Sequence, residues 1–216
     1  MMIKEKIDEF YMSHYKDRDK EHFYITDAGK CPRAIYFQFK KVPKKAFDAR
    51  VLRIFDHGDY THLRIISVLF SLGLVKGTEI DIPNKELVHG RADAIINIDN
   101  EPHVVEIKSI NSAAFNRLET ADGDHIKQIQ LYLYFFKIKK GTIIYENKNT
   151  QELKEFSVEY NENLVRDLLE KFHILKAQID SNIVPDVTQV DEWRCKYCPY
   201  SEECDKHKNG SSIKKV

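Results

Sequence analysis

The residues between 89 and 108 have the pattern of a β-hairpin, and this pattern constrains the fold more than any other segment. Two stretches rich in Val and Ile, 92–98 and 103–107, flank a turn-forming run that contains Asp, Asn and Pro. Glu106 and Lys108 are two residues apart, so on a strand their side chains point to the same face. A tight reversal brings Asp93 alongside them. The sequence therefore predicts two carboxylates and an ammonium on one face of a hairpin.

This trio is typical of a site that holds a divalent cation. A hard cation such as Mg²⁺ prefers oxygen ligands and keeps several waters, so two carboxylates and a substrate phosphate suffice to bind it. Cation and lysine together can activate water and stabilise the charge that develops on a phosphate. The ordinary alternative is that Asp93, Glu106 and Lys108 are solvated surface residues. The apolar strand 104–108 carries charges on one side only, which favours a site, because buried charges need a partner.

Length and composition fit one soluble domain. The chain has 216 residues, of which 42% are hydrophobic and 31% charged. No apolar stretch approaches the length that spans a membrane, so we expect a cytoplasmic protein without a membrane segment. The formal net charge is zero, so any surface that binds nucleic acid must be local. The basic runs 40–45, 137–140 and 206–215 are candidates, although each alone is typical of a solvated face.

The cysteines are spaced as in a metal or iron–sulphur site. Cys195, Cys198 and Cys204 form a C-x2-C-x5-C cluster, and Cys31 lies far upstream beside Pro32. In a reducing compartment this spacing favours metal binding over two disulfides. Cys31 at the start of a helix would be a stabilised thiolate, but taken alone it is better explained as a buried small hydrophobe. Together with His207 the three downstream cysteines could instead bind zinc, which would leave Cys31 idle.

Two helices are predicted ahead of the hairpin. Residues 2–24 carry apolar side chains at helical spacing, so we expect an amphipathic helix whose aromatic stripe lies in the core. Residues 46–74 predict a long helix in which Gly58 and His62 are one turn apart, and the glycine leaves open space beside the imidazole. A neutral imidazole could join the two carboxylates around a cation. We assign this role to His62, with His57 as the competing histidine.

A third helix, predicted over 125–136, places Gln128 and Tyr132 four residues apart on one face. An amide and a phenol beside a carboxylate site can orient a phosphate, a base or the lysine. The alternative is a helix whose tyrosines only pack. Ser109 begins a polar connection that could touch the backbone of a bound strand. Further strands are predicted at 77–83, 141–145 and 153–158, and a further helix at 163–180.

Together these motifs resemble the RecB-like branch of the PD-(D/E)xK nuclease superfamily, and most closely its CRISPR-associated exonucleases, the Cas-four family. The family's G-x3-H is matched by Gly58 and His62, its G-x2-D by Gly90 and Asp93, its ExK by Glu106 and Lys108, and its Q-x3-Y by Gln128 and Tyr132. The family's iron–sulphur ligands, one ahead of the nuclease core and three after it, are matched by Cys31, Cys195, Cys198 and Cys204. One departure is that Ala92 precedes the first acid, where the superfamily has proline.

The resemblance implies a DNA exonuclease that needs Mn²⁺ or Mg²⁺ and acts on single-stranded DNA or DNA ends. The implied metal ligands are His62, Asp93, Glu106 and the carbonyl of Ile107. Lys108 would position or deprotonate the attacking water, and Gln128, Tyr132 and Ser109 would contact the DNA. The four cysteines would hold a 4Fe-4S cluster that joins the two ends of the chain. In CRISPR adaptation the enzyme would trim spacer precursors, with DNA and the CRISPR integrase complex as partners, and a homo-oligomer is compatible with this role.

The expected fold is α/β, a restriction-endonuclease-like core with a central mixed sheet flanked by helices. We expect one nuclease domain over 1–205, with its core at 46–180, a cluster region at 25–37 and 190–205, and a disordered tail at 206–216. Two other functions compete with the CRISPR role. A stand-alone phage or chromosomal recombination and repair nuclease would have the same active site. A non-catalytic DNA-binding assembly module is less consistent with the presence of both acids and the lysine.

Overall fold

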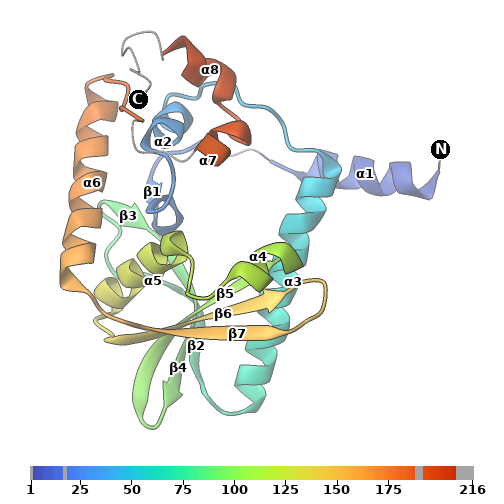
Figure 1. Cartoon of the computed structure of the whole chain (residues 1–216), viewed down its shortest axis with the longest axis vertical. Helices are drawn as coiled ribbons and strands as arrows, with labels where there is room; N and C mark the ends of the chain where they lie inside the picture. Colours follow the sequence, from blue (N-terminus) through green and yellow to red (C-terminus); the bar gives the residue numbers. More distant parts are fainter. Residues whose placement is uncertain (1, 17–18, 188–191, 208–216) are drawn as a thin grey trace.

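The predicted hairpin lies at the centre of a five-stranded mixed sheet (Figure 1). The structure is a computed structural model that describes residues 2–16, 19–187 and 192–207. The strand order is β2-β4-β5-β6-β7, in which β5 and β6 are parallel and the other neighbours antiparallel. The strands are β2 (Val75–Asp81), β4 (Arg91–Ile98), β5 (Glu101–Ile110), β6 (Lys140–Asn147) and β7 (Leu153–Glu159). The α/β fold predicted from the sequence is confirmed.

The hairpin turns through two residues, Asp99 and Asn100. Both have positive φ, 51° and 66°, as the favoured two-residue hairpin turns require. Pairing of β4 with β5 runs from Ile98 opposite Glu101 to Ala94 opposite Val105 and ends there. Beyond this point β5 continues to pair with β6 as far as Ile110 opposite Asn147. The two hairpin strands therefore separate where Asp93 and Glu106 begin, which opens a gap between them.

Helices cover both faces of the sheet (Figure 1). On one face α3 (Ala49–Ser71) packs Ile65 against a small cluster that includes Val105 and Ile107. On the other face α5 (Gly123–Phe136) packs Ile129 into the main core with Val104. Side chains alternate along β5, so Glu106 and Lys108 share the α5 face with Val104. The long α6 (Glu162–Asp180) packs on the outer side of α5.

The segment ahead of α3 meets the C-terminal helices above the sheet (Figure 1). It contains β1 (Phe23–Tyr24), which pairs in parallel with β3 (Val88–His89), then η1 (Ile25–Asp27) and α2 (Pro32–Phe39). The C-terminal helices are α7 (Glu192–Lys196) and α8 (Ser201–Lys206), and α4 (Ser112–Arg117) precedes α5. Buried Tyr200 packs on Phe37 of α2, with ring centroids 5.8 Å apart. Gly90 is needed for close approach, since a Cβ there would lie 2.6 Å from the side chain of Ile25.

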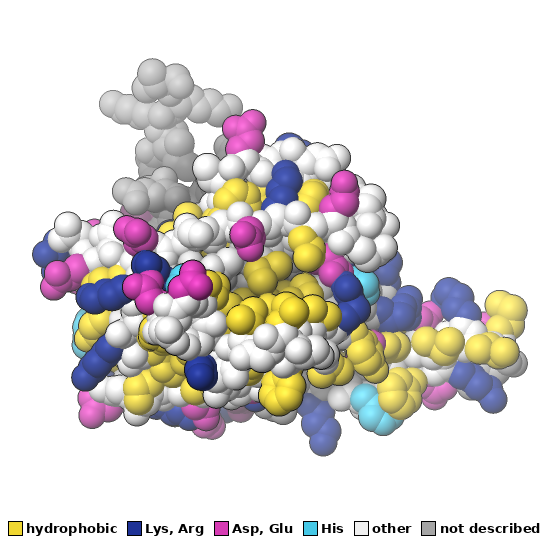
Figure 2. All heavy atoms as spheres, turned by 90° about the horizontal axis from the view of Figure 1, so that it is seen from below, with side chains coloured by type: hydrophobic (Ala, Val, Ile, Leu, Met, Phe, Trp, Pro, Cys, Tyr) yellow, Lys and Arg dark blue, Asp and Glu magenta, His cyan; other side chains and the backbone are white. Residues whose placement is uncertain are grey.

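The N-terminal helix differs from its prediction. The α1 helix spans Ile3–His14 rather than residues 2–24, and none of its residues is buried. It projects from the body of the molecule and carries exposed apolar side chains, Phe10 being 56% exposed (Figures 1 and 2). The expectation that its aromatic stripe lies in the core is wrong, because α1 joins α3 through polar contacts such as Tyr11 Oη to Asp56, 2.8 Å.

Two further expectations concern the ends and the surroundings of the chain. In the tail predicted to be disordered, Lys206 is instead the last residue of α8, and residues 208–216 lie outside the described part. No helix within the described residues is long and apolar enough to cross a membrane.

Candidate active site

Asp93 lies at the point where the hairpin strands separate. Its Oδ2 accepts a hydrogen bond from the main-chain N–H of Ile107 over 2.7 Å. This N–H is free to bond a side chain because the β4–β5 ladder has already ended at Val105. The other oxygen, Oδ1, lies 3.3 Å from Nδ1 of His62 on α3. His62, which was selected by its spacing from Gly58, is therefore the histidine that contacts Asp93, and Gly58 leaves open space one turn away.

Glu106 is the most buried acid of the site and is held from one side only. Its Oε1 accepts hydrogen bonds from Lys108 Nζ and from Gln128 Nε2, the latter over 2.7 Å. Lys108 Nζ also donates to Gln128 Oε1 over 3.1 Å, which closes a triangle of acid, lysine and amide. The second oxygen, Glu106 Oε2, is buried and has no hydrogen-bond partner among the described residues. Burial of a carboxylate oxygen without a hydrogen-bond partner is energetically unfavourable, so this atom is a candidate ligand for a cation.

The ionisable groups of the site lie close enough to shift one another's pKa values. Burial, followed by the nearby charge of Asp93, raises the pKa of Glu106 to about 7, against the opposing effect of Lys108. Burial lowers the pKa of His62, but its hydrogen bond and charge interaction with Asp93 outweigh this and leave that pKa raised. Two acids this close repel each other when both are ionised. A bound cation would relieve that repulsion.

The donor set fits a hard divalent cation. It offers the carboxylate of Asp93, the carboxylate of Glu106 with its unpartnered Oε2, and the imidazole of His62. Because N–H and C=O of one strand residue point to the same side, the carbonyl of Ile107 also faces the gap beside Asp93. Within residues 2–16, 19–187 and 192–207, however, no three His, Cys, Asp or Glu side chains are grouped as a preformed metal site. The ligands therefore need side-chain rotations to enclose an ion.

Tyr132 and Ser109 are placed differently from the rest of the predicted set. The Tyr132 ring is buried, and its hydroxyl donates to the main-chain carbonyl of Arg91 over 2.7 Å. Burial raises the pKa of Tyr132 well above its usual range, so the phenol stays protonated. Ser109 is on the opposite face of β5 from Lys108, and its buried hydroxyl has no partner in the described part of the chain. The structure thus brings His62, Asp93, Glu106, Lys108 and Gln128 together, and leaves Ser109 outside.

Sequence reasoning missed two neighbours of the site, His125 and Tyr145. His125 lies one helical turn before Gln128, and its Nδ1 is 2.8 Å from the hydroxyl of Tyr145. Tyr145 is fully buried on β6, directly opposite Lys108. The three-residue spacing from His125 to Gln128 was a signal that could have found the histidine, because it places both on one helix face. No sequence signal indicated the pairing with Tyr145.

The cysteines come together from the two ends of the chain. All four are partly buried, and Cys31 interacts electrostatically with Cys195 and Cys204. Burial is the largest effect that raises the pKa of Cys31 and Cys198, and the neighbouring thiols add to it. Buried Arg33 donates to Cys204 Sγ at 3.4 Å. Arg194 ties the C-terminal segment to α5 through Asp124, 2.6 Å away. As at the carboxylate site, the described residues form no preformed metal group here.

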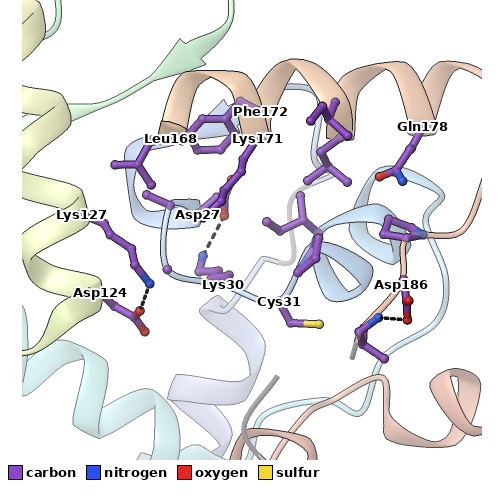
Figure 3. Close-up of a pocket in the computed structure, with 18 of the residues that line it drawn as sticks. Asp27, Lys30, Cys31, Asp124, Lys127, Leu168, Lys171, Phe172, Gln178 and Asp186 are labelled. Atoms are coloured by element: carbon purple, nitrogen blue, oxygen red, sulfur yellow. Dashed lines mark hydrogen bonds and ion pairs between the residues drawn. The ribbon is translucent and has the colours of Figure 1, made fainter. Parts of the chain in front are cut away.

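A cavity of about 460 Å³ lies beside this region, between α6 and the turn that leads into α2 (Figure 3). Cys31 lies at its wall, and the ion pairs Lys30–Asp27 and Lys127–Asp124 lie along its sides. None of the active-site acids lines it. The cavity therefore belongs to the cysteine region rather than to the carboxylate site.

Comparisons with known proteins agree with this geometry. Residues 16–205 match the PD-(D/E)XK nuclease superfamily. The chain is 30% identical to the CRISPR-associated exonuclease Cas4 of Saccharolobus solfataricus, over 94% of this chain and 95% of that protein. It is similar to the crystal structure of SSO0001, with 26% identity, a TM-score of 0.59 and coverage of 94% and 93% of the two chains. An alkaline exonuclease from Laribacter hongkongensis shares the fold, with 11% identity, a TM-score of 0.56 and coverage of 83% and 94%. The chain belongs to the PD-(D/E)XK nuclease superfamily and is a nuclease.

Proposed function

We propose that this nuclease is a DNA exonuclease that requires Mn²⁺ or Mg²⁺ and acts on single-stranded DNA or DNA ends. The observation that carries the metal dependence is Glu106, a buried acid with one oxygen held by Lys108 and Gln128 and the other without a partner. Exonuclease activity is the function of the Saccharolobus relative, which matches nearly the whole chain.

Four groups would hold the cation in this proposal: the carboxylates of Asp93 and Glu106, the carbonyl of Ile107 and the imidazole of His62. Such a cation, when bound, supplies Lewis-acid stabilisation of the phosphate charge and lowers the pKa of a water. Asp93 is held for this task by the Ile107 N–H, and His62 is held by Asp93. Rotation of His62 Nδ1 away from Asp93 would free one carboxylate oxygen for the ion.

Lys108 would position the attacking water or take its proton. Its ammonium donates to Glu106 and Gln128, which holds Nζ beside the carboxylate of Glu106. A third N–H is available for a water or a phosphate oxygen, because no third acceptor is found among the described residues. Gln128 would orient both charged groups, and Tyr132 would position β4 through the Arg91 carbonyl. In this proposal Gln128 and Tyr132 are both positioning residues, and Gln128 is the nearer of the two to the bound DNA.

A 4Fe-4S cluster on Cys31, Cys195, Cys198 and Cys204 completes the proposed enzyme. The mutual interaction of Cys31 with the downstream thiols supports this set. The zinc alternative needs His207, but its Nε2 lies 3.5 Å from Glu203 Oε1 and its ring packs near Phe37. The cluster would join the two chain ends into a single domain over 1–205, with Arg33 compensating part of its negative charge.

The biological role that we propose is the trimming of spacer precursors in CRISPR adaptation, together with the integrase complex. Its support is the CRISPR-associated relative, of which the chain covers 95%. A stand-alone repair nuclease would have the same site, so the genes that neighbour the coding sequence decide between the two roles. A homo-oligomer is compatible with either role.

The test uses the full chain, purified without oxygen, and end-labelled single-stranded and blunt duplex DNA. Wild-type protein should shorten DNA from an end with Mn²⁺ or Mg²⁺ and not with EDTA. Glu106→Gln and Lys108→Met should each lower cleavage by about a hundredfold or more. The matched control is Lys176→Met, which removes a lysine paired with Asp180 on the exposed side of α6. Equal cleavage by Lys108→Met and Lys176→Met would refute the proposed site.

A further inference from the structure

His125 has a hydrogen-bonding arrangement that decides which of its nitrogens carries the proton. The hydroxyl of Tyr145 accepts the main-chain N–H of Asp122 over 3.0 Å and lies 2.8 Å from His125 Nδ1. Tyr145 is fully buried, so its own O–H must donate to a protein group. Among the described residues the acceptor in reach is His125 Nδ1. Nδ1 therefore carries no proton and accepts the hydrogen bond, and the neutral imidazole has its proton on Nε2.

The surroundings of His125 keep the imidazole neutral. A proton on Nδ1 would leave the buried Tyr145 hydroxyl without an acceptor, which is unfavourable. The charged groups that face the ring are Lys108 from β5 and the acids Asp122 and Asp124 from the start of α5. Burial, followed by the positive charge of Lys108, lowers the pKa of His125 to about 4. At neutral pH the ring is thus an uncharged donor through Nε2–H.

The position of His125 relates this donor to the active site. It precedes Gln128 by one turn on α5, so both side chains project from the same helix face. Gln128 contacts Glu106 and Lys108, and the positive charge of Lys108 lowers the pKa of the His125 imidazole. His125 is half-buried, so part of its side chain is exposed to solvent. A neutral donor beside a cation site binds an anionic oxygen without repelling the cation.

We propose that His125 is a substrate-contacting residue whose Nε2–H donates a hydrogen bond to a phosphate oxygen of the DNA strand beside Lys108. Tyr145 is its positioning residue, because its hydroxyl fixes the tautomer and the ring orientation. The inference rests on the proposed active site and adds to it a contact that is independent of the metal ligands. It makes the Tyr145–His125 pair part of strand binding.

Two amide substitutions separate this role from a structural one. The short amide of His125→Asn reaches the place of Nδ1, so it keeps the Tyr145 contact and loses the donor to DNA. The longer amide of His125→Gln reaches the place of Nε2, so it keeps the donor and loses the Tyr145 contact. We expect His125→Asn to lower kcat/KM by about tenfold to a hundredfold, the size of one hydrogen bond to a charged group. His125→Gln should retain most of the wild-type value and melt at a lower temperature.

The opposite order of the two variants, or an equal loss in both, would overturn the proposal. An independent measurement is the ¹⁵N spectrum of histidine-labelled protein without DNA, which should show a pyridine-type Nδ1 and a pyrrole-type Nε2. Tyr145→Phe should remove this tautomer preference, and a wild-type ring protonated on Nδ1 would refute the proposal. If His125→Asn is as active as wild type where Glu106→Gln is inactive, the further inference fails and the proposed function stands.

Discussion

The main-chain N–H of Ile107 donates to Asp93 Oδ2 over 2.7 Å, across the gap in which β4 and β5 no longer pair. Strand separation thus provides both a free backbone donor and the space for a ligand. Glu106, the residue next to Ile107 on β5, carries the unpartnered Oε2. The candidate active site therefore lies where the hydrogen-bonded pairing of β4 and β5 ends.

Asp93→Asn should fold, because the amide oxygen can still accept the Ile107 N–H, but it should bind the cation poorly. We expect cleavage to fall by about a hundredfold or more, since cation stabilisation is worth several kcal/mol. The rise in melting temperature on adding Mn²⁺ should shrink as well. The control is Asp99→Asn in the turn, where φ of 51° suits either residue. An unchanged Mn²⁺ effect in Asp93→Asn would exclude Asp93 as a ligand.

Tyr132→Phe should lower the free energy of unfolding by about 1 kcal/mol, because the Arg91 carbonyl loses its donor in a partly buried place. Cleavage should fall less than in Asp93→Asn, since β4 shifts but keeps its carboxylate. Urea unfolding followed by circular dichroism measures the first effect. Tyr134→Phe is the matched control, since Tyr134 is 42% exposed on the same helix. Similar unfolding energies in the two variants would contradict the positioning role.

The stability of the metal-free protein should depend on pH through Glu106. Its pKa rises from 4.5 in the unfolded reference to about 7 in the fold, mainly by burial. The folded chain thus holds the proton more tightly, and this contribution to stability is present below pH 4.5 and lost as pH rises through about 7. In EDTA, Glu106→Gln should gain stability relative to wild type between about pH 5.5 and about pH 8. A constant difference in unfolding free energy would show that burial does not shift this acid.

Cys31→Ser should abolish the iron–sulphur absorption and reduce bound iron and sulphide, whereas His207→Ala should leave both unchanged. The reason is that Cys31 interacts with the downstream thiols, while His207 is directed to Glu203. Iron, sulphide and zinc analysis of anaerobically purified protein measures the outcome. Stoichiometric zinc that is lost in His207→Ala and kept in Cys31→Ser would establish the zinc site instead.

Much of the fold was predictable because its signals are local. The α6 periodicity, the Val- and Ile-rich strands and the Asp99–Asn100 turn each depend on residues close in sequence. The prediction for α1 failed because apolar periodicity shows that a helix has a face, but not whether the body of the protein covers that face. Ile3 is accordingly 79% exposed.

The sequence by itself determined the hairpin, the shared face of Glu106 and Lys108, and the choice of His62 by its spacing from Gly58. Only the tertiary structure decided which atom contacts which. It directs Tyr132 to the Arg91 carbonyl, leaves Glu106 Oε2 unpartnered and pairs His125 with Tyr145. The His125–Tyr145 contact joins residues that are 20 apart in the chain, and the Tyr132–Arg91 contact joins residues that are 41 apart. Spacing within a strand or helix follows from its repeat, whereas contacts between elements depend on how the sheet and the helices pack.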